Sequence, residues 1–331
     1  MAQKVTIATV ARRAGVSRQT VSNVLNAPHV VREETRQRVQ EAIDALGYRT
    51  NQAARQMRTG RSRLIAVRIE PTRDGINGSV LDRFLHGLSE TAGTAGYRVM
   101  LYTAVDDEQE IREYGDLLGA YDLDAFVLTG TKRGDPRTAW LAARNVPFVT
   151  FGRPWDDPTA HPWVDVDGAD GTAQATRRLL ALGHRQIGFV GWPVGSGVGD
   201  DRRLGWEHTL RAAGVDPIDL DRRTEDGIVE GERAARSLLD AARPATALVC
   251  VSDSLALGAL QAVRTADPAV PVIGFDDTPV AAAVGLTSVC QPLHQAAVRC
   301  VELLAGLLDD TPRQIHPQVL LKPHLVLRQT A

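Results

Sequence analysis

The sequence predicts a small helical domain at the N-terminus and a larger α/β core made of two lobes. Apolar residues recur at helical spacing through residues 7–46, whereas short apolar strands alternate with amphipathic helices from Leu64 onward. The charge changes at the same point, because residues 1–63 carry 12 lysines and arginines against 4 acidic residues, and residues 64–331 carry 26 against 36. A basic first domain on an acidic core indicates that the first domain binds a polyanion, although a local fluctuation in composition would give the same counts.

The composition and the cysteine count are typical of a globular protein in a reducing compartment. Of the 331 residues, 44% are hydrophobic and 24% charged, as in an ordinary globular protein. Cys250, Cys290 and Cys300 lie at no metal-ligand spacing, and three is an odd count for a disulfide framework. The start "MAQKVTIATVARR" has no apolar signal segment, and no apolar run is long enough to cross a membrane. We therefore expect a cytoplasmic protein with no metal, no cofactor and no membrane partner.

The first domain shows signals for three helices. Thr6 is placed to cap a helix over "IATVARRA", and Gly15 suits the tight turn that follows it. Ser17 is placed to cap the second helix, and a third covers about Arg32–Leu46. Two helices joined by a short turn with glycine form the helix-turn-helix pattern, whose second helix enters the major groove of DNA.

The second helix separates an apolar face from a polar one. Its inward residues are Val16, Val21, Val24 and Leu25. Arg18, Gln19 and Asn23 face outward near its start. Arginine suits guanine, while glutamine and asparagine suit adenine, so we expect these three to read bases, although solvation alone would explain any one of them. The residues expected to contact the DNA backbone are Ser17, Thr20, Ser22, Asn26 and His29.

These segments together resemble a known family. "VTIATVARRAGVSRQTVSNVLN", followed by "TRQRVQEAIDALGY" and "NQAARQM", closely resembles the head of the lactose-repressor (LacI/GalR) family of bacterial transcription regulators, and the match runs through the rest of the chain. The resemblance implies a homodimer that binds double-stranded palindromic operator DNA on the nucleoid. It also implies repression of sugar-utilisation genes.

Residues 51–63 are expected to join the helix-turn-helix domain of residues 1–50 to the core. In the family this segment is a hinge helix that orders on the operator and pushes apolar side chains into the minor groove. Asn51 is placed to cap that helix, Ala54 lies inside it, and Met57 stands where the family usually has a leucine wedge. Thr50 replaces a usual proline. A solvated basic linker is the alternative.

The core, residues 64–331, alternates strands with helices. The expected strands are "LIAVRI", "RVMLYTA", "AFVLTGT", "FVTFG", "IGFVGW", "ALVCVSD" and "VPVIGFDD". The expected helices are Val80–Ala95, Glu108–Tyr121, Ala169–Leu182, Arg202–Ala213, Gly231–Ala241 and Leu255–Thr265. This pattern predicts parallel sheets covered on both faces, as in two Rossmann-like lobes in series.

The resemblance implies that the two lobes form a periplasmic-binding-protein-like core, in which the chain crosses between lobes three times. We place the crossings near Val164, Val289 and Leu321. The first lobe then comprises about residues 64–164 and 293–320. The second comprises about 165–290 and 321–331.

A ligand is expected beyond the carboxyl ends of the strands. Candidate residues at these ends are Glu70, Arg153, Trp155, Trp192, Ser252, Asp253, Asp276 and Asp277. By resemblance, Arg202 in "RRLGW" and Asp276 in "GFDD" match the family's effector-binding arginine and aspartate, and Gln291 lies on a crossover that lines the cleft. A guanidinium and a carboxylate bind vicinal hydroxyls through charge-assisted hydrogen bonds, and the tryptophans Trp155, Trp163 and Trp192 can stack on a pyranose.

The prediction is therefore a mono- or disaccharide bound between the lobes that controls operator affinity. Two departures leave other effectors open, a purine among them. Ser252 stands where the family often has asparagine, and Gly152 then Arg153 follow the fourth strand, where many members have aspartate. Asp276 or Asp277 is also placed to cap a helix starting near Thr278. Trp155 and Trp192 are equally compatible with core or interface positions.

Two rival classes fit less well. An enzyme would need a recognisable motif, but "GSGVGD" is not G-x-G-x-x-G, no P-loop occurs, and the eight histidines form no metal motif. A free sugar-binding receptor should have a signal peptide and no basic helix-turn-helix. The chain ends soon after "LLKPHLVLRQTA" without an apolar heptad tail, so we expect a dimer and not a tetramer.

Overall fold

The computed structural model describes residues 5–48, 60–69, 76, 78–266, 269–308 and 316–331. The chain separates into two compact units, Met1–Ser62 and Arg63–Ala331, and each is described by itself. The hinge residues Asn51, Ala54 and Met57, and the core residue Glu70, lie outside the described residues. Their predicted roles therefore stay predictions.

The first unit has the predicted helix-turn-helix arrangement. Its elements are α1 (Ile7–Ala14), α2 (Arg18–Asn26), the 3₁₀ turn η1 (Pro28–Val30) and α3 (Glu33–Leu46). The side chain of Thr6 caps α1, and that of Ser17 caps α2 by accepting from the N–H of Thr20. Gly15 ends α1 with φ of 65°, a left-handed conformation that favours glycine. The buried core of this unit consists of Val10, Ala11, Ala14, Val21, Val24, Val39, Ala42 and Ile43.

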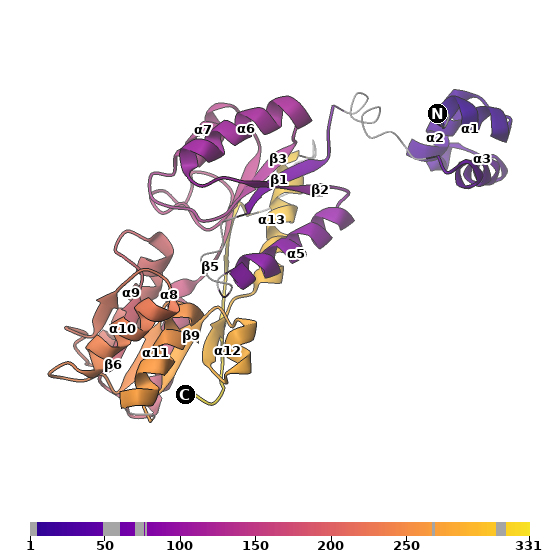
Figure 1. Ribbon diagram of the computed structural model, residues 1–331. Helices are drawn as coiled ribbons and strands as arrows, with labels where there is room; N and C mark the ends of the chain where they lie inside the picture. The colour runs from indigo at the N-terminus through magenta and orange to yellow at the C-terminus, as the bar shows by residue number, and fades with distance from the viewer. Residues whose placement is uncertain (1–4, 49–59, 70–75, 77, 267–268, 309–315) are drawn as a thin grey trace. The chain divides into compact units, whose positions relative to one another are not determined.

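Within the described residues, the first lobe of the core contains a six-stranded sheet in the order β11-β5-β4-β3-β1-β2, with parallel pairing throughout. The strands are β1 (Leu64–Ile69), β2 (Arg98–Thr103), β3 (Ala125–Leu128), β4 (Phe148–Phe151), β5 (Trp163–Val166) and β11 (Gln318–Leu321). Its helices are α5 (Gly78–Thr94), α6 (Asp107–Tyr121), α7 (Pro136–Ala143) and α13 (Leu293–Leu308). As Figure 1 shows, α5 and α13 cover one face and α6 and α7 the other, each over a separate apolar core.

The second lobe repeats this plan. Its six-stranded sheet has the order β12-β10-β9-β8-β6-β7 in the described residues, and only β12 runs antiparallel to its neighbour there. The strands are β6 (Ile187–Gly191), β7 (Asp221–Arg223), β8 (Ala247–Cys250), β9 (Val272–Phe275), β10 (Thr287–Cys290) and β12 (His324–Val326). The helices are α8 (Gly168–Ala181), α9 (Gly197–Ala212), α10 (Ile228–Leu239), α11 (Asp253–Ala266) and α12 (Pro279–Ala283).

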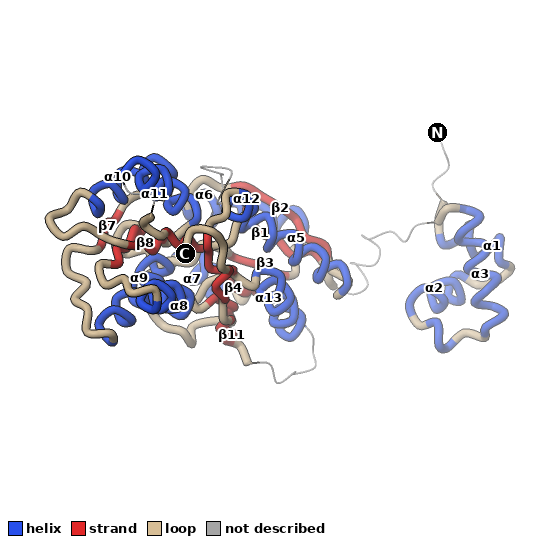
Figure 2. The backbone as a smooth tube through the Cα atoms, turned by 90° about the horizontal axis from the view of Figure 1, so that it is seen from below, coloured by secondary structure: helices blue, strands red, loops and turns tan. Residues whose placement is uncertain are grey.

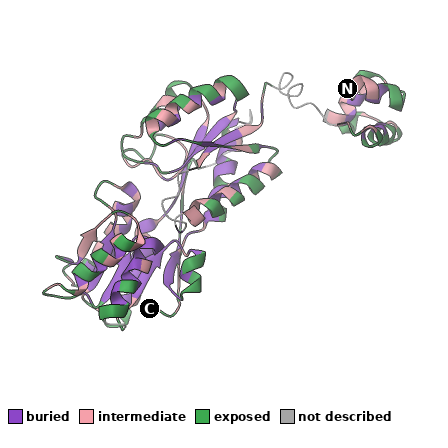
Figure 3. Cartoon of the chain, in the orientation of Figure 1, coloured by how far each residue is buried: buried purple, intermediate pink, exposed green. Residues whose placement is uncertain are grey.

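Helices cover both faces of the second sheet, and its central strands are buried as a result. Figure 2 shows α10 and α11 on one side of the strands and α8 and α9 on the other. All four residues of β8 and of β9 are buried, and Figure 3 shows these strands in purple. Burial on both faces explains why the strands read as continuous apolar runs and not as alternating ones.

The chain passes between the two sheets at three places. It leaves the first sheet after β5, returns between β10 and α13, and leaves again between β11 and β12. In residue numbers these passages are 166–168, 290–293 and 321–324, and the predicted crossings were near Val164, Val289 and Leu321. The carboxyl ends of the strands of both sheets therefore lie close to the passages.

Several helices begin earlier than predicted, and the difference is largest for α9. The predicted helix starts at Arg202, whereas α9 begins at Gly197 because Ser196 caps it by accepting from the N–H of Gly199. Glycines disfavour helix by about 1 kcal/mol each, so their presence argued for a loop. Close packing explains the glycine at 197, since a Cβ there would lie 2.4 Å from the ring of Trp155. Residues 196–198 therefore belong to the start of a helix in the second lobe.

Candidate functional site

A cavity of about 470 Å³ lies between the two lobes at the carboxyl ends of their strands; we call it the cleft. From the first lobe it is lined chiefly by Val80, Leu81, Thr131, Lys132, Phe151 and Asp165. From the second lobe it is lined by Trp192, Ser196, Val198, Arg202, Asp276 and Gln291. Its volume is in the range of small-molecule sites, and its lining combines aromatic and apolar groups with a few polar ones.

Arg202 is a buried cation in the cleft wall. Its side chain is 6% exposed, and its Nη1 donates to the carbonyl oxygen of Val251 at 2.5 Å. The guanidinium lies over the ring of Phe275 at 3.6 Å and faces that of Trp192 at 5.4 Å. Burial lowers the pKa of Arg202, and the charge of Asp276 opposes that effect. Its Nε is buried and has no hydrogen-bond partner among the described residues, so it is a donor that a ligand could satisfy.

Asp276 is the carboxylate that faces this arginine. Its Oδ1 lies 3.5 Å from Nη1 of Arg202 and accepts from Nε2 of Gln291 at 2.7 Å. Burial raises its pKa to about 7, while Arg202 and Gln291 act in the opposite direction. The backbone at Asp276 has φ of 110°, which is rare for a residue other than glycine and marks a strained turn held by its surroundings.

The helix that follows this turn is capped by another residue. The side chain of Thr278 caps α12 by accepting from the N–H of Ala281. The alternative in which Asp276 or Asp277 caps this helix is therefore wrong. The Asp276 side chain is instead one of those that line the cleft.

The outer surface of α2 carries the candidate DNA-contacting residues. Arg18 and Gln19 are exposed, and Asn23 is half-buried. Gln19 Nε2 donates to Asn23 Oδ1 at 3.0 Å, so these two amides form one polar unit along the helix. Of the predicted backbone contacts, Thr20 and Ser22 are half-buried and Ser17 and His29 are exposed, while the side chain of Asn26 lies outside the described part.

Comparison with known proteins identifies the family. The model of bacterial regulatory proteins of the lacI family matches residues 6–51, and that of periplasmic binding protein-like domains matches residues 176–331. The HTH-type transcriptional regulator AglR of Rhizobium meliloti is 32% identical, covering 92% of this chain and 89% of the relative. The regulator CelR of Thermobifida fusca is also 32% identical, covering 98% of each. The chain belongs to the lacI family.

Solved structures of lacI-family regulators have the same fold. The Lac repressor dimer bound to operator and the anti-inducer ONPF superposes with a TM-score of 0.82 at 26% identity, covering 99% of both chains. A CelR–cellobiose complex superposes with a TM-score of 0.73 at 29% identity, covering 99% of this chain and 100% of the other. These matches confirm the helix-turn-helix head, the bilobed α/β core and the transcription-regulator class predicted from the sequence.

Several residues predicted for the effector site of this lacI-family protein lie behind the cleft wall and not in it. Asp253 is fully buried, and its Oδ2 accepts from the N–H of Thr278 at 2.7 Å. Its Oδ1 accepts from the hydroxyl of Ser288 at 2.6 Å, and the same hydroxyl accepts from the N–H of Asp277. Arg328 donates to the carboxylate of Asp277 at 2.6 Å. Asp253 therefore supports the strained turn that presents Asp276.

Ser252 and Trp192 share one partner. The hydroxyl of Ser252 and Nε1 of Trp192 both donate to Oδ1 of Asp226, at 2.5 and 2.9 Å. Trp192 lines the cleft, whereas Ser252 is fully buried and is not among the lining residues. Asp226 thus fixes the orientation of the Trp192 ring, and Ser252 supports Asp226.

The other two tryptophans predicted near the ligand, Trp155 and Trp163, do not line the cleft, and neither does Arg153. Arg153 donates to Oδ2 of Asp165 at 2.6 Å and lies 3.3 Å from Asp201 of α9, so it joins the two lobes at the cleft edge. Trp155 packs against Gly197 and lines a neighbouring cavity. Trp163 is buried and donates to the carbonyl of Pro158, so the prediction that it lies near the ligand is wrong. It is a core residue of the first lobe because β5 is covered on both faces.

Several residues that line the cleft were not predicted from the sequence. Thr131 is the last residue of the predicted strand "AFVLTGT" and Lys132 follows it, so the strand-end rule that selected Trp192 also applies to them. Lys132 forms an ion pair with Asp107 at the start of α6. Val80 and Leu81 are apolar residues of α5, and nothing in the sequence distinguishes them from residues of the helix core.

The described residues contain no helix that is both long and apolar enough to cross a membrane. In the same part of the chain, no cluster of three or more histidine, cysteine, aspartate or glutamate side chains is arranged to hold a metal ion.

Replacing Asp253 with alanine is expected to destabilise the core. The change leaves the Thr278 N–H and the Ser288 hydroxyl buried without an acceptor, which costs roughly 2–4 kcal/mol. The melting temperature of the core should fall by roughly 5–15 °C in a thermal unfolding experiment. Asp240→Ala, at an exposed position of the same lobe, is the control and should leave the melting temperature unchanged. Equal melting temperatures for the two variants would show that Asp253 does not hold the turn.

Proposed function

We propose that this chain is a repressor that binds a palindromic operator as a homodimer and releases it when a neutral saccharide occupies the cleft. The observation that carries the effector class is the arrangement of Arg202, Asp276 and Gln291 on one wall of the cleft. A hydroxyl group can accept from Nε of Arg202 and donate to the carboxylate of Asp276, so this wall suits vicinal hydroxyls.

The charges of the cleft favour a neutral ligand. Among the described lining residues, Lys132 is paired with Asp107, Asp165 with Arg153, and Arg202 with Asp276. A phosphate or carboxylate group would therefore meet cations that are already neutralised. Trp192 and Phe151 provide apolar surface for the carbon–hydrogen face of a sugar ring. The CelR–cellobiose complex, a relative at 29% identity, supports the same ligand class.

The lobes are linked by polar contacts that a bound ligand would alter. Besides Arg153 and Asp201, Arg83 of α5 donates to the carbonyl oxygen of Asp277 at 3.2 Å. A ligand held by both lobes favours the arrangement of the lobes in which it makes more contacts. It shifts the equilibrium between two lobe arrangements only by the difference in its affinity for them. Because β1 follows the segment that joins head to core, we propose that a rotation of the first lobe separates the two hinges of the dimer. The heads would then keep only weak, salt-dependent DNA binding.

The proposal is tested by selecting the binding site and then titrating the complex. Selection from random DNA with the full-length protein should return a palindrome, and the selected duplex should be released by a mono- or disaccharide from a panel of neutral sugars. Purine bases and nucleosides form the second arm, because a purine is the alternative effector. Release by a purine and by no sugar would overturn the effector class. Failure to select any preferred sequence would contradict the operator-binding role. The relatives are named as transcriptional regulators, and we propose a regulatory role and not a catalytic one.

Effector affinity is expected to rise with pH across the neutral range. Burial raises the pKa of Asp276 to about 7, and the groups around it are Arg202, Gln291, Asp253 and Asp226. Sugar hydroxyls that donate to the carboxylate favour its ionised form, so binding below this pKa must release a proton. Below this pKa the carboxyl of Asp276 is protonated in the free protein. The affinity for the saccharide therefore falls as the pH drops through about 7, and it is about tenfold lower one pH unit below the pKa.

Calorimetry provides the measurement. Titrations at pH 6 in two buffers with different ionisation enthalpies should give different heats for the wild-type protein, and equal heats at pH 8.5. Asp276→Asn should remove the buffer dependence, since the amide carries no titrating proton. Buffer-independent heats for the wild type at pH 6 would show that Asp276 is ionised before the sugar binds.

A further inference from the structure

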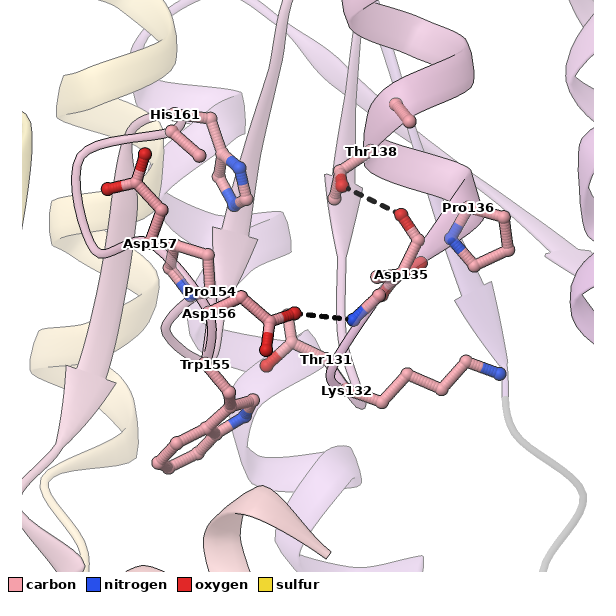
Figure 4. Close-up of a pocket in the computed structure, with 13 residues that line it drawn as sticks. Thr131, Lys132, Asp135, Pro136, Thr138, Pro154, Trp155, Asp156, Asp157 and His161 are labelled. Atoms are coloured by element: carbon pink, nitrogen blue, oxygen red, sulfur yellow. Dashed lines mark hydrogen bonds between the residues drawn. The ribbon is translucent and has the colours of Figure 1, made fainter. Parts of the chain in front are cut away.

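A second cavity of about 320 Å³ lies in the first lobe beside the cleft; we call it the side cavity. Two loops form its walls, residues 131–136 after β3 and residues 154–161 after β4, and the first turn of α7 closes it. Figure 4 shows the two loops on opposite sides of the cavity and Trp155 at one end. Both loops follow carboxyl ends of strands in the same sheet, which is the edge where the cleft also lies.

The side cavity and the cleft share part of their lining. Thr131 and Lys132 line both cavities. Trp155 lines the side cavity, and its ring packs against Gly197, which lines the cleft. The boundary between the two cavities therefore includes one aromatic side chain of the first lobe, resting on the first turn of α9 in the second lobe.

The indole N–H of Trp155 is a hydrogen-bond donor without an acceptor among the described residues. Its Nε1 is buried and, in the part of the chain that the structure describes, has no hydrogen-bond partner. The guanidinium of Arg153 lies 4.9 Å from the centre of its ring. A Cβ on Gly197 would lie 2.5 Å from this nitrogen, so the N–H lies against the start of α9, and Gly197 itself lines the cleft. Buried indole N–H groups usually find an acceptor, so this unused donor is a candidate partner for an oxygen atom of a ligand.

The carboxylates of the side cavity already have hydrogen-bond partners, and that of Asp157 accepts from the hydroxyl of Thr159 at 2.6 Å. Asp135 accepts from Arg137 at 2.7 Å, and Asp156 accepts from the N–H of Gly134 at 2.6 Å. Burial lowers the pKa of His161, so its imidazole is neutral at pH 7, and its Nε2 lies 3.1 Å from the hydroxyl of Thr150. With Lys132 paired to Asp107 and three aspartates in the lining, the cavity disfavours an anionic ligand. Pro136, Pro154, Ala139 and Ala160 add apolar wall.

We propose that the side cavity is a second subsite of the effector site and takes a sugar unit linked to the one held by Arg202 and Asp276. This inference rests on the proposed function, and it narrows the effector class to a neutral di- or trisaccharide. The indole N–H of Trp155 donates to an oxygen of the ligand near the linkage. The apolar walls of the side cavity contact the carbon–hydrogen faces of the second unit, and His161 and Thr138 lie within the lining to bind its hydroxyls.

The first test fills the side cavity without touching the cleft. Ala139→Phe places a ring in the cavity, and Ala142→Phe is the matched control, since both alanines are exposed on α7 and only Ala139 lines the cavity. Calorimetry with the full chain would use the tightest di- and trisaccharides from a panel of glucose, galactose and xylose oligomers, together with their monosaccharides. Ala139→Phe is expected to weaken binding of the longer sugars at least about tenfold and to leave the monosaccharide unchanged. Ala142→Phe should change neither.

The second test isolates the N–H of Trp155. Trp155→Phe keeps an aromatic ring against Gly197 and removes the donor, so affinity for the longer sugars should fall by about three- to tenfold while that for the monosaccharide is kept. Equal affinity of monosaccharide and longer sugars in the wild type, or equal effects of Ala139→Phe and Ala142→Phe, would overturn the second subsite and leave the proposed cleft site standing. A chain that binds no sugar of any length would overturn the proposed function and the subsite with it.

Discussion

Replacing Arg202 with alanine is expected to abolish the response to saccharide while the protein still binds its operator. The guanidinium supplies the unused Nε donor, and it faces Asp276 in a wall with almost no exposure to solvent. Truncating one partner of a buried charge pair costs about 2–5 kcal/mol, which corresponds to at least about a thirtyfold loss of affinity. Operator binding is expected to depend on α2 in the head, which forms a compact unit separate from the core that holds Arg202, and is therefore expected to persist.

The control for this prediction is the next residue of the same helix. Arg203 pairs with Glu207 and with Asp221 at 2.8 Å, and it does not line the cleft. Arg203→Ala should keep the wild-type sugar response in a gel-shift titration. Since Arg202 also binds the carbonyl of Val251, thermal unfolding must show that Arg202→Ala is folded, and Arg202→Lys supplies a second variant that keeps the charge. Release of Arg202→Ala from the operator at the wild-type sugar concentration would exclude this arginine from the effector site.

Replacing Arg18 with alanine is expected to relax the operator preference at one symmetric pair of base positions. Arg18 is exposed at the first turn of α2, where the start of a recognition helix meets the base edges of the major groove. A bidentate contact between arginine and guanine is worth roughly 1–3 kcal/mol of discrimination in each half-site. Binding-site selection with the variant should thus return a consensus that is degenerate at that pair, and affinity for the wild-type operator should fall by roughly tenfold or more.

Arg38→Ala is the matched control, because Arg38 is an exposed arginine of the same unit on α3. The control should keep the wild-type consensus. If Arg18 instead binds a phosphate, the variant will lose affinity equally for all sequences and show a shallower dependence on salt, without any change in the selected consensus. The two outcomes are therefore separated by comparing selected sites and salt titrations for the same pair of variants.

The arrangement of the head could be predicted from the sequence because its determinants are local. The hydroxyls of Thr6 and Ser17 cap α1 and α2 by accepting from the backbone N–H three residues later. Gly15 adopts a left-handed conformation that a residue without a side chain reaches easily. The apolar stripe of α3 has helical spacing in the sequence and forms the core in the structure. The predicted strands of the core could also be found from the sequence, because strands buried on both faces appear as continuous apolar runs. Arg202, Asp276 and Gln291 came from the family resemblance, and their side chains do lie together in the cleft wall.

Only the tertiary structure decided which polar residues face the cleft. Ser252 and Asp253 follow a strand end as the rule requires, yet both are fully buried, because the turn before α12 needs Asp253 as an acceptor and Asp226 takes the hydroxyl of Ser252. The glycine at the start of α9 is explained by Trp155, which is distant in the sequence and belongs to the other lobe, because a Cβ at residue 197 would lie 2.4 Å from its ring. These outcomes depend on hydrogen bonds and packing between segments far apart in the chain. Residue type and spacing indicate where a strand ends. They do not indicate which group from a distant segment forms a hydrogen bond with each polar side chain in the folded protein.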